Sequence, residues 1–484
     1  MSGTPKFISP SRVARFYFHE CERYLRYSST PSELRDAEGV PKTPYDFRPI
    51  TQAIFETGFL WEERVLDEQL AGLVHISRSN QEAPVRDRVL TADETKELLT
   101  SIEPGEWIYQ PTLISPAGFY ERYGINPSVV QVTECRPDLI ECFEADGRRS
   151  FRVTDVKAST GVKLSHRIQS TMYSLILDHV LTDWGVDERT VAETGGVWLS
   201  HTPEPEHFDI RAMRPPLEKF LQQELQPLME APASEAPWHV YFRCEWCDYF
   251  DHCAREMRDT NDVSRVPYLS HHAKRYLATL DPPVGTVRAL EKLAKSDHAS
   301  EVFADAASLR GRTTRIRLQT EALRSGETKT TGTASVAMPK AEHVRIVLTL
   351  QDEPVTGQVY AYGIYGQGLK DVLGENPKPV TDVARDSDPE TIRALEQDFI
   401  VSLHALLSKV DAYNLDREGD WYAQKSLQAF AFDSYEWTLL TVSSSAASTI
   451  PGSLRRHSRS SSISSSRSFW RRRNTPRPKC SSRS

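Results

Sequence analysis

The strongest constraint on the fold is a run of predicted strands and helices between residues 129 and 200. Residues 129–144 and 151–158 have the composition of strands, and the turn signal Ala145-Asp146-Gly147 separates them. Helices are predicted at 10–27, 54–70 and 165–181, and a further strand at 196–200. Strands interleaved with helices in this way predict an α/β fold.

Composition divides the 484 residues into two populations. The net charge is −8, but residues 443–484 contain nine Arg, one Lys and no acidic residue. The other 442 residues carry 49 basic and 67 acidic groups, a net charge of −18, so bulk charge gives no argument for nucleic-acid binding. No apolar run reaches the ~18 residues of a membrane span, and the N-terminus lacks a signal-peptide pattern. We therefore expect an intracellular protein, cytoplasmic or nuclear, with no membrane partner.

The pattern predicts four regions. Residues 1–260 mix strands and helices, and 261–325 form a helical connector, with helices at 268–280, 284–295 and 304–325. After a linker at 325–340, residues 341–442 form a second α/β region, with strands at 343–350, 358–363 and 427–432 and a helix at 389–410. The Ser/Arg-rich tail, 443–484, is expected to be disordered. It is either an artefact of a frameshift or gene model, or a basic arm that binds nucleic acid.

Two acids and a lysine form the first candidate site. Residues two apart in a strand share a face, so Asp155 and Lys157 project together, and Asp138 lies where the preceding strand begins. Two carboxylates with a lysine suit hydrolysis assisted by Mg²⁺ or Mn²⁺. The alternative is three surface residues on a hairpin.

The next predicted helix carries Gln169 and Tyr173 at positions i and i+4, on one face. An amide and a phenol there can contact phosphate or base edges beside the metal site. The alternative is an ordinary amphipathic helix.

These stretches resemble the RecB-like branch of the PD-(D/E)XK nucleases. The matching segments are R-P-D-L-I (136–140), T-D-V-K-A-S (154–159) and H-R-I-Q-S-T-M-Y (166–173). The resemblance implies a restriction-endonuclease-like core, a mixed sheet flanked by helices, over residues 1–260. In that family the aspartates bind the metal, the lysine is catalytic and the Q-x3-Y pair helps to hold DNA.

The family has a further acid on an earlier helix, and Gly58 to Glu63 resembles that motif. The His that commonly accompanies the acid is missing, and either Trp61 or Glu62 takes its place, depending on the alignment. We predict Glu62 as the third acid, against the alternative of a solvent-facing pair of glutamates.

Cys244-x2-Cys247-x5-Cys253 is an uncommon spacing that points to a metal. The segment ending in Cys21 resembles the N-terminal helix of iron–sulfur nucleases of the same branch. In these proteins one Cys before the core and three after it bind a [4Fe–4S] cluster, which implies Cys21 as the fourth ligand. Structural Zn²⁺ or three unrelated core cysteines are the alternatives. Cys135 and Cys142 are expected to be packing residues, and Cys480 to be unliganded.

The region 341–442 resembles an RNase H-like exonuclease domain. Thr349 and Gln351 stand at its two acidic positions, so we expect an inactive domain that serves as a scaffold or binds nucleic acid. A register using Asp352 and Glu353 places the two acids on opposite faces. The loop 282–287 resembles a helix-hairpin-helix element, with simple packing as the alternative. The chain has no P-loop, so an associated helicase would be a separate partner.

The main hypothesis is a Mg²⁺- or Mn²⁺-dependent DNA nuclease for single strands or DNA ends, acting in repair or processing. Its rival is a non-catalytic nucleic-acid-binding or scaffold remnant of a nuclease–helicase. Cleavage polarity, endo- or exonuclease action, DNA or RNA preference, pathway and oligomeric state stay open.

Overall fold

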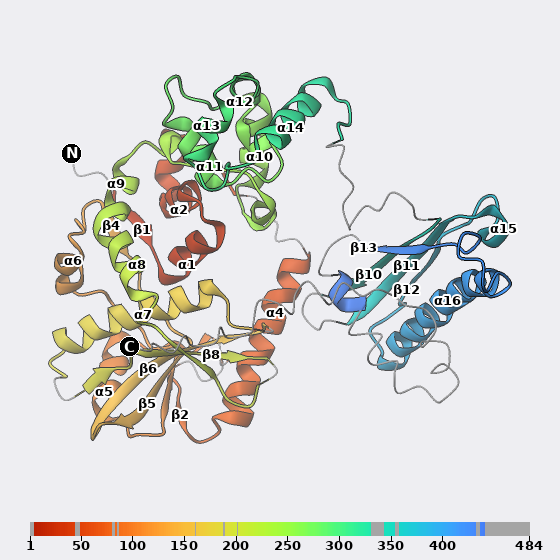
Figure 1. Ribbon diagram of the computed structural model, residues 1–484. Coiled ribbons are helices and arrows are strands. Elements are labelled where there is room, and N and C mark those ends of the chain that lie inside the picture. The colour runs from red at the N-terminus through yellow and green to blue at the C-terminus, as the bar shows by residue number, and fades with distance from the viewer. Residues whose placement is uncertain are drawn as a thin grey trace, which may run out of the picture. The chain divides into compact units, whose positions relative to one another are not determined.

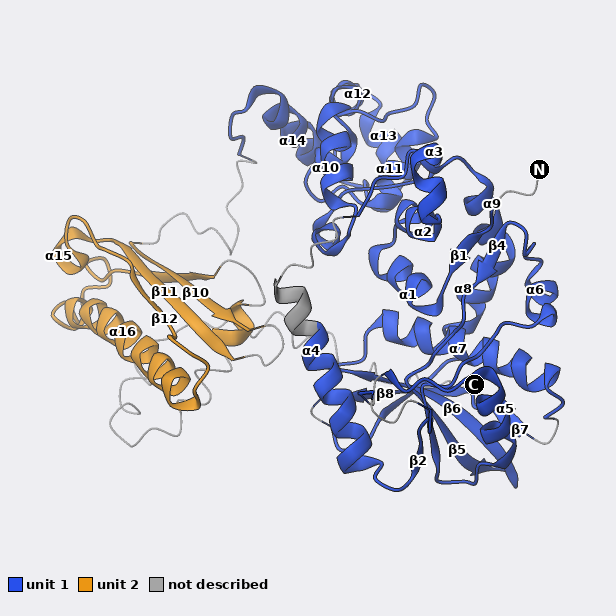
Figure 2. Cartoon of the chain, turned by 180° about the vertical axis from the view of Figure 1, so that it is seen from behind, with its two compact units in different colours: residues 1–333 blue, residues 334–484 orange. Residues whose placement is uncertain are grey.

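The computed structural model describes residues 4–43, 49–79, 83–84, 87–159, 161–186, 189–200, 202–330, 343–353, 358–431 and 436–440. The chain forms two compact units, residues 1–333 and 334–484, which are shown in different colours in Figure 2. The predicted tail at 443–484, including Cys480, lies outside the described residues. Within the described part of the chain, no helix has the length and apolar character needed to cross a membrane.

The first unit is built on a mixed seven-stranded sheet, in the order β2-β3-β5-β6-β8-β9, with β7 paired to β6. Strand β6 is central because it pairs antiparallel with β5 on one side and parallel with β8 on the other. A separate parallel pair joins β1 to β4. The strands are β1 (Lys6–Ile8), β2 (Val74–His75), β3 (Trp107–Tyr109), β4 (Val130–Val132), β5 (Leu139–Ala145), β6 (Arg148–Lys157), β7 (Arg189–Val191), β8 (Thr194–Leu199) and β9 (Glu206–Asp209).

Helices cover both faces of this sheet. On one face, helix α7 packs Ile168 and Met172 into a core with Val153 of β6. On the other face, Trp61 of helix α4 and Val65, which directly follows that helix, pack against alternate strand residues in a second core. The helices are α1 (Pro10–His19), α2 (Glu22–Ser29), α3 (Arg35–Glu38), α4 (Pro49–Arg64), α5 (Ala92–Ser101), α6 (Ala117–Tyr123), α7 (Leu164–Asp183), α8 (Arg214–Lys219), α9 (Leu225–Glu230), α10 (Phe250–Asp259), α11 (His271–Ala278), α12 (Val287–Ala294), α13 (Ala299–Ala304) and α14 (Thr313–Ser325) (Figure 1).

The predicted α/β class is confirmed, but three predicted elements are divided in the structure. The helix predicted at 10–27 is two helices, because Glu20 adopts the left-handed conformation (φ 47°) and ends α1. The strand predicted at 129–144 is divided into β4 and β5. The helix predicted at 304–325 begins only at Thr313, as α14. Its first residue, Ala304, is the last residue of α13, and Gly311 (φ +73°) lies in the turn between the two helices.

The loop 282–287 uses its backbone for internal packing. The amide of Val284 donates to the carbonyl of Leu277 at 2.9 Å, and that of Val287 donates to Asn261 at 2.9 Å. Both valine side chains are buried in the core that holds α11, α12 and α14 together. Of the two readings of this loop, these contacts favour packing, since amides that donate internally are not free to bind a nucleic-acid backbone.

The second unit is a four-stranded sheet in the order β12-β11-β10-β13, and only the β10–β13 pair is parallel. Leu395 and Phe399 of its long helix α16 pack against the sheet in a core with Ile346 and Ile364. The elements are β10 (Val344–Asp352), β11 (Val359–Gly368), α15 (Lys370–Leu373), β12 (Val380–Val383), α16 (Pro389–Leu415) and β13 (Leu427–Ala431).

We predict that Gly196 is required where β8 meets β6. A Cβ atom at Gly196 would lie 2.4 Å from Oγ1 of Thr154 on β6. Gly196→Ala is therefore expected to lower the free energy of unfolding by about 1–3 kcal/mol through overpacking. The matched control is Gly58→Ala in α4, where nothing lies within 4 Å of the added Cβ. There the helical preference of alanine should stabilise by about 0.5–1 kcal/mol. Chemical denaturation measures both, and equal effects of the two substitutions would contradict the packing argument.

Candidate active site and cysteine cluster

The structure brings Asp155, Lys157 and Asp138 together at the ends of β6 and β5. Asp155 is fully buried (0% exposed), and Nζ of Lys157 lies 3.9 Å from its Oδ2 atom. The same Nζ donates to Oδ2 of Asp138 at 3.0 Å, and the amide of Val156 donates to that oxygen at 2.8 Å. The backbone of β6 thus holds Asp138 in place, and the lysine lies between the two carboxylates.

Glu62 of α4 joins this group from the other side of the sheet. Its Oε1 atom accepts hydrogen bonds from Oη of Tyr109 at 2.8 Å and from Nε2 of Gln110 at 3.4 Å. Trp61, the alternative position, is buried and donates its Nε1 to the carbonyl of Trp198. The structure therefore places Glu62 beside the aspartates and Trp61 in the core.

The electrostatics of the four groups show an uncompensated negative charge. Burial raises the pKa of Asp155 to about 7; Lys157 opposes this shift, and the charges of Asp138 and Glu62 add to it. Burial followed by repulsion from Asp138 also raises the pKa of Glu62. Burial lowers the pKa of Lys157, but the two aspartates outweigh it, so this pKa is raised overall and the lysine stays charged. One lysine cannot neutralise three acids.

Both carboxylate oxygens of Asp155 are buried without a hydrogen-bond partner. A buried carboxylate in this state is costly unless a cation or a proton compensates it. The oxygen donors of Asp155, Asp138 and Glu62 are those that Mg²⁺ and Mn²⁺ prefer, so the residues present fit such an ion. Within the described ranges, however, no three His, Cys, Asp or Glu side chains already stand in a metal-binding arrangement. Lys157 lies between the aspartates instead.

The two residues predicted on α7 have different surroundings. Tyr173 is buried, and its hydroxyl donates to the carbonyl of Arg136 at 3.1 Å. It therefore fixes the segment leading to Asp138, while the DNA contact expected of it stays a prediction. Gln169, one turn earlier, is partly exposed and close enough to hydrogen-bond with Tyr173.

Sequence reasoning missed three neighbours of this site. Tyr109 and Gln110 hold Glu62, and Gln110 has a left-handed backbone (φ 43°), which is strained for a non-glycine residue. Burial and then the positive charge of Lys157 lower the pKa of His166 to about 4. His166 lies in a segment already singled out, but the sequence gave no signal for Tyr109 or Gln110.

The four predicted cysteine ligands come from separate elements. Cys21 caps α2 at its N-terminus, Cys244 and Cys247 lie in and just after the 3-10 turn Phe242–Trp246, and Cys253 lies in α10. The thiols are electrostatic neighbours, since Cys21, Cys244 and Cys253 all add to the effect of burial on the pKa of Cys247. This pKa rises to about 12, as does that of Cys21. Four thiols are the donors of a structural zinc or iron–sulfur site, so their chemistry suits such a group. In the part of the chain that the structure describes, however, no three of them already stand in a metal-binding arrangement.

A buried cation lies beside these thiols. Arg23 is 3% exposed, and its guanidinium stacks on Trp238 at 4.5 Å and pairs with Glu256. Burial raises the pKa of Cys253, and the Arg23 charge opposes this shift. The Nε atom of Arg23 has no hydrogen-bond partner, so this donor is available to a deprotonated sulfur. Cys135 and Cys142 are buried in the core, as predicted.

In the second unit, Thr349 and Gln351, which stand at the two acidic positions of the RNase H-like resemblance, contact Glu436. Oγ1 of Thr349 donates to Oε1 of Glu436 at 2.5 Å, and Nε2 of Gln351 donates to the same oxygen at 3.0 Å. A hydroxyl and an amide thus both donate to this carboxylate.

Comparison with known proteins gives no family assignment. The sequence matches no family model and no curated protein significantly.

The raised pKa of Asp155 predicts a pH-dependent stability. Its carboxyl titrates at about 7 when folded and at the ordinary 3.8 when unfolded, so the folded state holds the extra proton between these values. The free energy of unfolding should therefore fall as the pH rises from about 4 to about 7, by up to roughly 4 kcal/mol. Asp155→Asn should remove this loss and be more stable than wild type at pH 8 in EDTA.

Denaturation at pH 5 and pH 8 measures this effect. Asp297→Asn, at an exposed position, is the matched control and should follow the wild type. A wild-type protein whose stability does not change over this range would show that Asp155 is compensated by another group.

Proposed function

We propose that the first unit is a metal-dependent nuclease that hydrolyses phosphodiester bonds in single-stranded DNA or at DNA ends. The observation that carries this proposal is the buried carboxylate of Asp155, which accepts no hydrogen bond at either oxygen and lies next to Asp138, Glu62 and Lys157. In this cluster one lysine pairs with both aspartates, so three acids share a single positive charge, which favours a bound cation.

Asp155 and Asp138 would hold Mg²⁺ or Mn²⁺, with Glu62 as the third acid. When bound, the ion activates a water and neutralises charge on the phosphate. Lys157 stays protonated, so its Nζ can orient the attacking water and stabilise the negative charge that develops on the phosphate. Tyr173 and the amide of Val156 keep Asp138 and its chain segment in register with β6.

The architecture supports assignment of the first unit to the PD-(D/E)XK nucleases of the RecB-like branch. Asp155 and Lys157 stand two apart on a central strand, Asp138 precedes the neighbouring strand, and α7 follows directly.

We further propose that Cys21, Cys244, Cys247 and Cys253 bind a [4Fe–4S] cluster, with structural Zn²⁺ as the alternative. Such a group would tie the N-terminal helices to the turn at residues 242–247, which lies more than 220 residues later in the chain. Arg23 supplies a positive charge for the thiolates that binding requires.

For the second unit we propose a role without catalysis. We propose an inactive RNase H-like domain, because Thr349 and Gln351 stand at its two acidic positions and donate to Glu436. This observation also supports the alternative for the whole chain, a non-catalytic nucleic-acid-binding or scaffold remnant that works with a separate helicase.

A cleavage assay tests the nuclease. Asp155→Ala and Lys157→Ala should each reduce Mg²⁺- or Mn²⁺-dependent cleavage of labelled single-stranded DNA by about 1,000-fold or more, because they remove the metal ligand and the charge at the phosphate. Asp297→Ala and Lys292→Ala, both at exposed positions, are the matched controls and should cleave at the wild-type rate.

Circular dichroism establishes that each variant is folded. Full cleavage by both Asp155→Ala and Lys157→Ala, or no cleavage by the wild type with either ion, would favour the non-catalytic alternative.

Metal analysis tests the cysteine site. Protein purified without oxygen from Cys21→Ser or Cys253→Ser should lose the bound iron or zinc, because three thiolates close neither site. Cys135→Ser is the matched control, since burial raises the pKa of this thiol to about 12 as well. Visible absorption distinguishes iron–sulfur from zinc. A metal content in Cys21→Ser equal to that of the wild type would show that Cys21 is not a ligand.

A further inference from the structure

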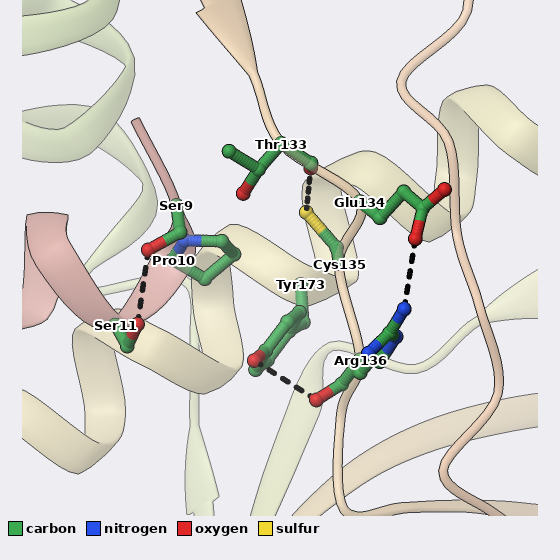
Figure 3. A pocket seen from close by; sticks show the side chains of 8 residues that line it. All are labelled: Ser9, Pro10, Ser11, Thr133, Glu134, Cys135, Arg136 and Tyr173. Atoms are coloured by element: carbon green, nitrogen blue, oxygen red, sulfur yellow. Dashed lines mark hydrogen bonds and ion pairs between the residues drawn. The ribbon is translucent and has the colours of Figure 1, made fainter. Parts of the chain in front are cut away.

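A cavity of about 470 Å³ opens between the start of α1 and the segment that leads to Asp138 (Figure 3). Its volume falls within the range of sites that enclose small ligands, roughly 300–1,000 Å³. The residues that matter here are Ser9, Ser11, Thr133, Glu134, Arg136 and Tyr173.

The cavity adjoins the proposed catalytic carboxylates. Tyr173, which lines it, donates a hydrogen bond to Arg136, two residues before Asp138. Burial raises the pKa of Tyr173 well above its ordinary value, and the charges of Asp155 and Asp138 raise it further, so this ring lies near both carboxylates. A molecule in the cavity would therefore lie next to the site of cleavage.

The walls carry the chemistry that binds a sugar–phosphate backbone. Three hydroxyls, from Ser9, Ser11 and Thr133, can donate to phosphate oxygens, and Oγ of Ser9 and Oγ of Ser11 lie 2.9 Å apart. Arg136 adds a guanidinium and Tyr173 a ring. Arginine, serine, threonine and tyrosine side chains make most contacts to phosphate and sugar in nucleic-acid complexes.

One residue of the wall, Glu134, would repel a phosphate. Oε2 of Glu134 accepts from Nη2 of Arg136 at 2.8 Å, and the two side chains are 57% and 49% exposed. An exposed ion pair of this kind contributes little to stability and rearranges easily. Glu134 therefore weakens the attraction of the cavity for an anion, and its removal should release the guanidinium.

We propose that this cavity holds the nucleotide next to the scissile phosphodiester of a single strand. The proposal rests on the proposed nuclease function, which sets the position of the scissile bond. The walls come from the start of α1, residues 133–136 and Tyr173 of α7, and the single strand is the substrate of the proposed function.

Binding of a fluorescein-labelled single-stranded oligonucleotide, followed by anisotropy in EDTA, tests the cavity separately from cleavage. Ser11→Asp places a charge on the exposed first turn of α1, where an acid is compatible with the helix, and should weaken binding about 10-fold. Ser11→Ala should weaken it by only about two-fold. Glu134→Gln should strengthen binding about three-fold. Ser300→Asp, at an exposed position on α13, is the control and should bind as wild type.

DNA and RNA strands of one sequence serve as separate probes, and opposite effects of Ser11→Asp and Glu134→Gln on either of them support the cavity. Wild-type binding by both variants, together with loss of cleavage in Asp155→Ala, would overturn the cavity proposal alone. Equal effects on a duplex would overturn the single-strand assignment. Cleavage retained in both Asp155→Ala and Lys157→Ala would overturn the nuclease, whatever the binding results.

Discussion

A fully buried carboxylate in a central strand is the constraint on which the first unit depends. Asp155 lies between β5 and β8, away from solvent and without a hydrogen-bond donor at either oxygen. Its neighbours do not offset the cost of burying this charge. Asp138 and Glu62 add negative charge, and Lys157 supplies only one positive charge. The fold retains a group that costs stability near neutral pH, and such groups concentrate at functional sites.

The second constraint is the break between α1 and α2. The left-handed Glu20 ends the first helix, and the extended Cys21 begins the next, which turns this thiol toward the turn at residues 242–247. A continuous helix over residues 10–27 would carry the chain in one direction. The break therefore brings Cys21 close to Cys244 and Cys253, and the buried Arg23 follows it directly.

The two units contrast in how they treat their buried acids. In the first unit, Asp155 accepts no hydrogen bond, and the single charge of Lys157 faces three acids. In the second, Thr349 and Gln351 donate hydrogen bonds to the carboxylate of Glu436. The same physical rule, that a buried charge needs a partner, is met by hydrogen-bond donors in the second unit and by one shared lysine in the first.

The sequence by itself determined the α/β class, the shared face of Asp155 and Lys157 and the burial of Cys135 and Cys142, because these depend on local periodicity and composition. It did not determine where helix 10–27 breaks, or that Tyr109 and Gln110 hold Glu62, or that Tyr173 is buried against Arg136. It also left Trp61 and Glu62 as alternatives. The tertiary structure decided these features, because each depends on contacts between residues far apart in the chain, which no local pattern encodes.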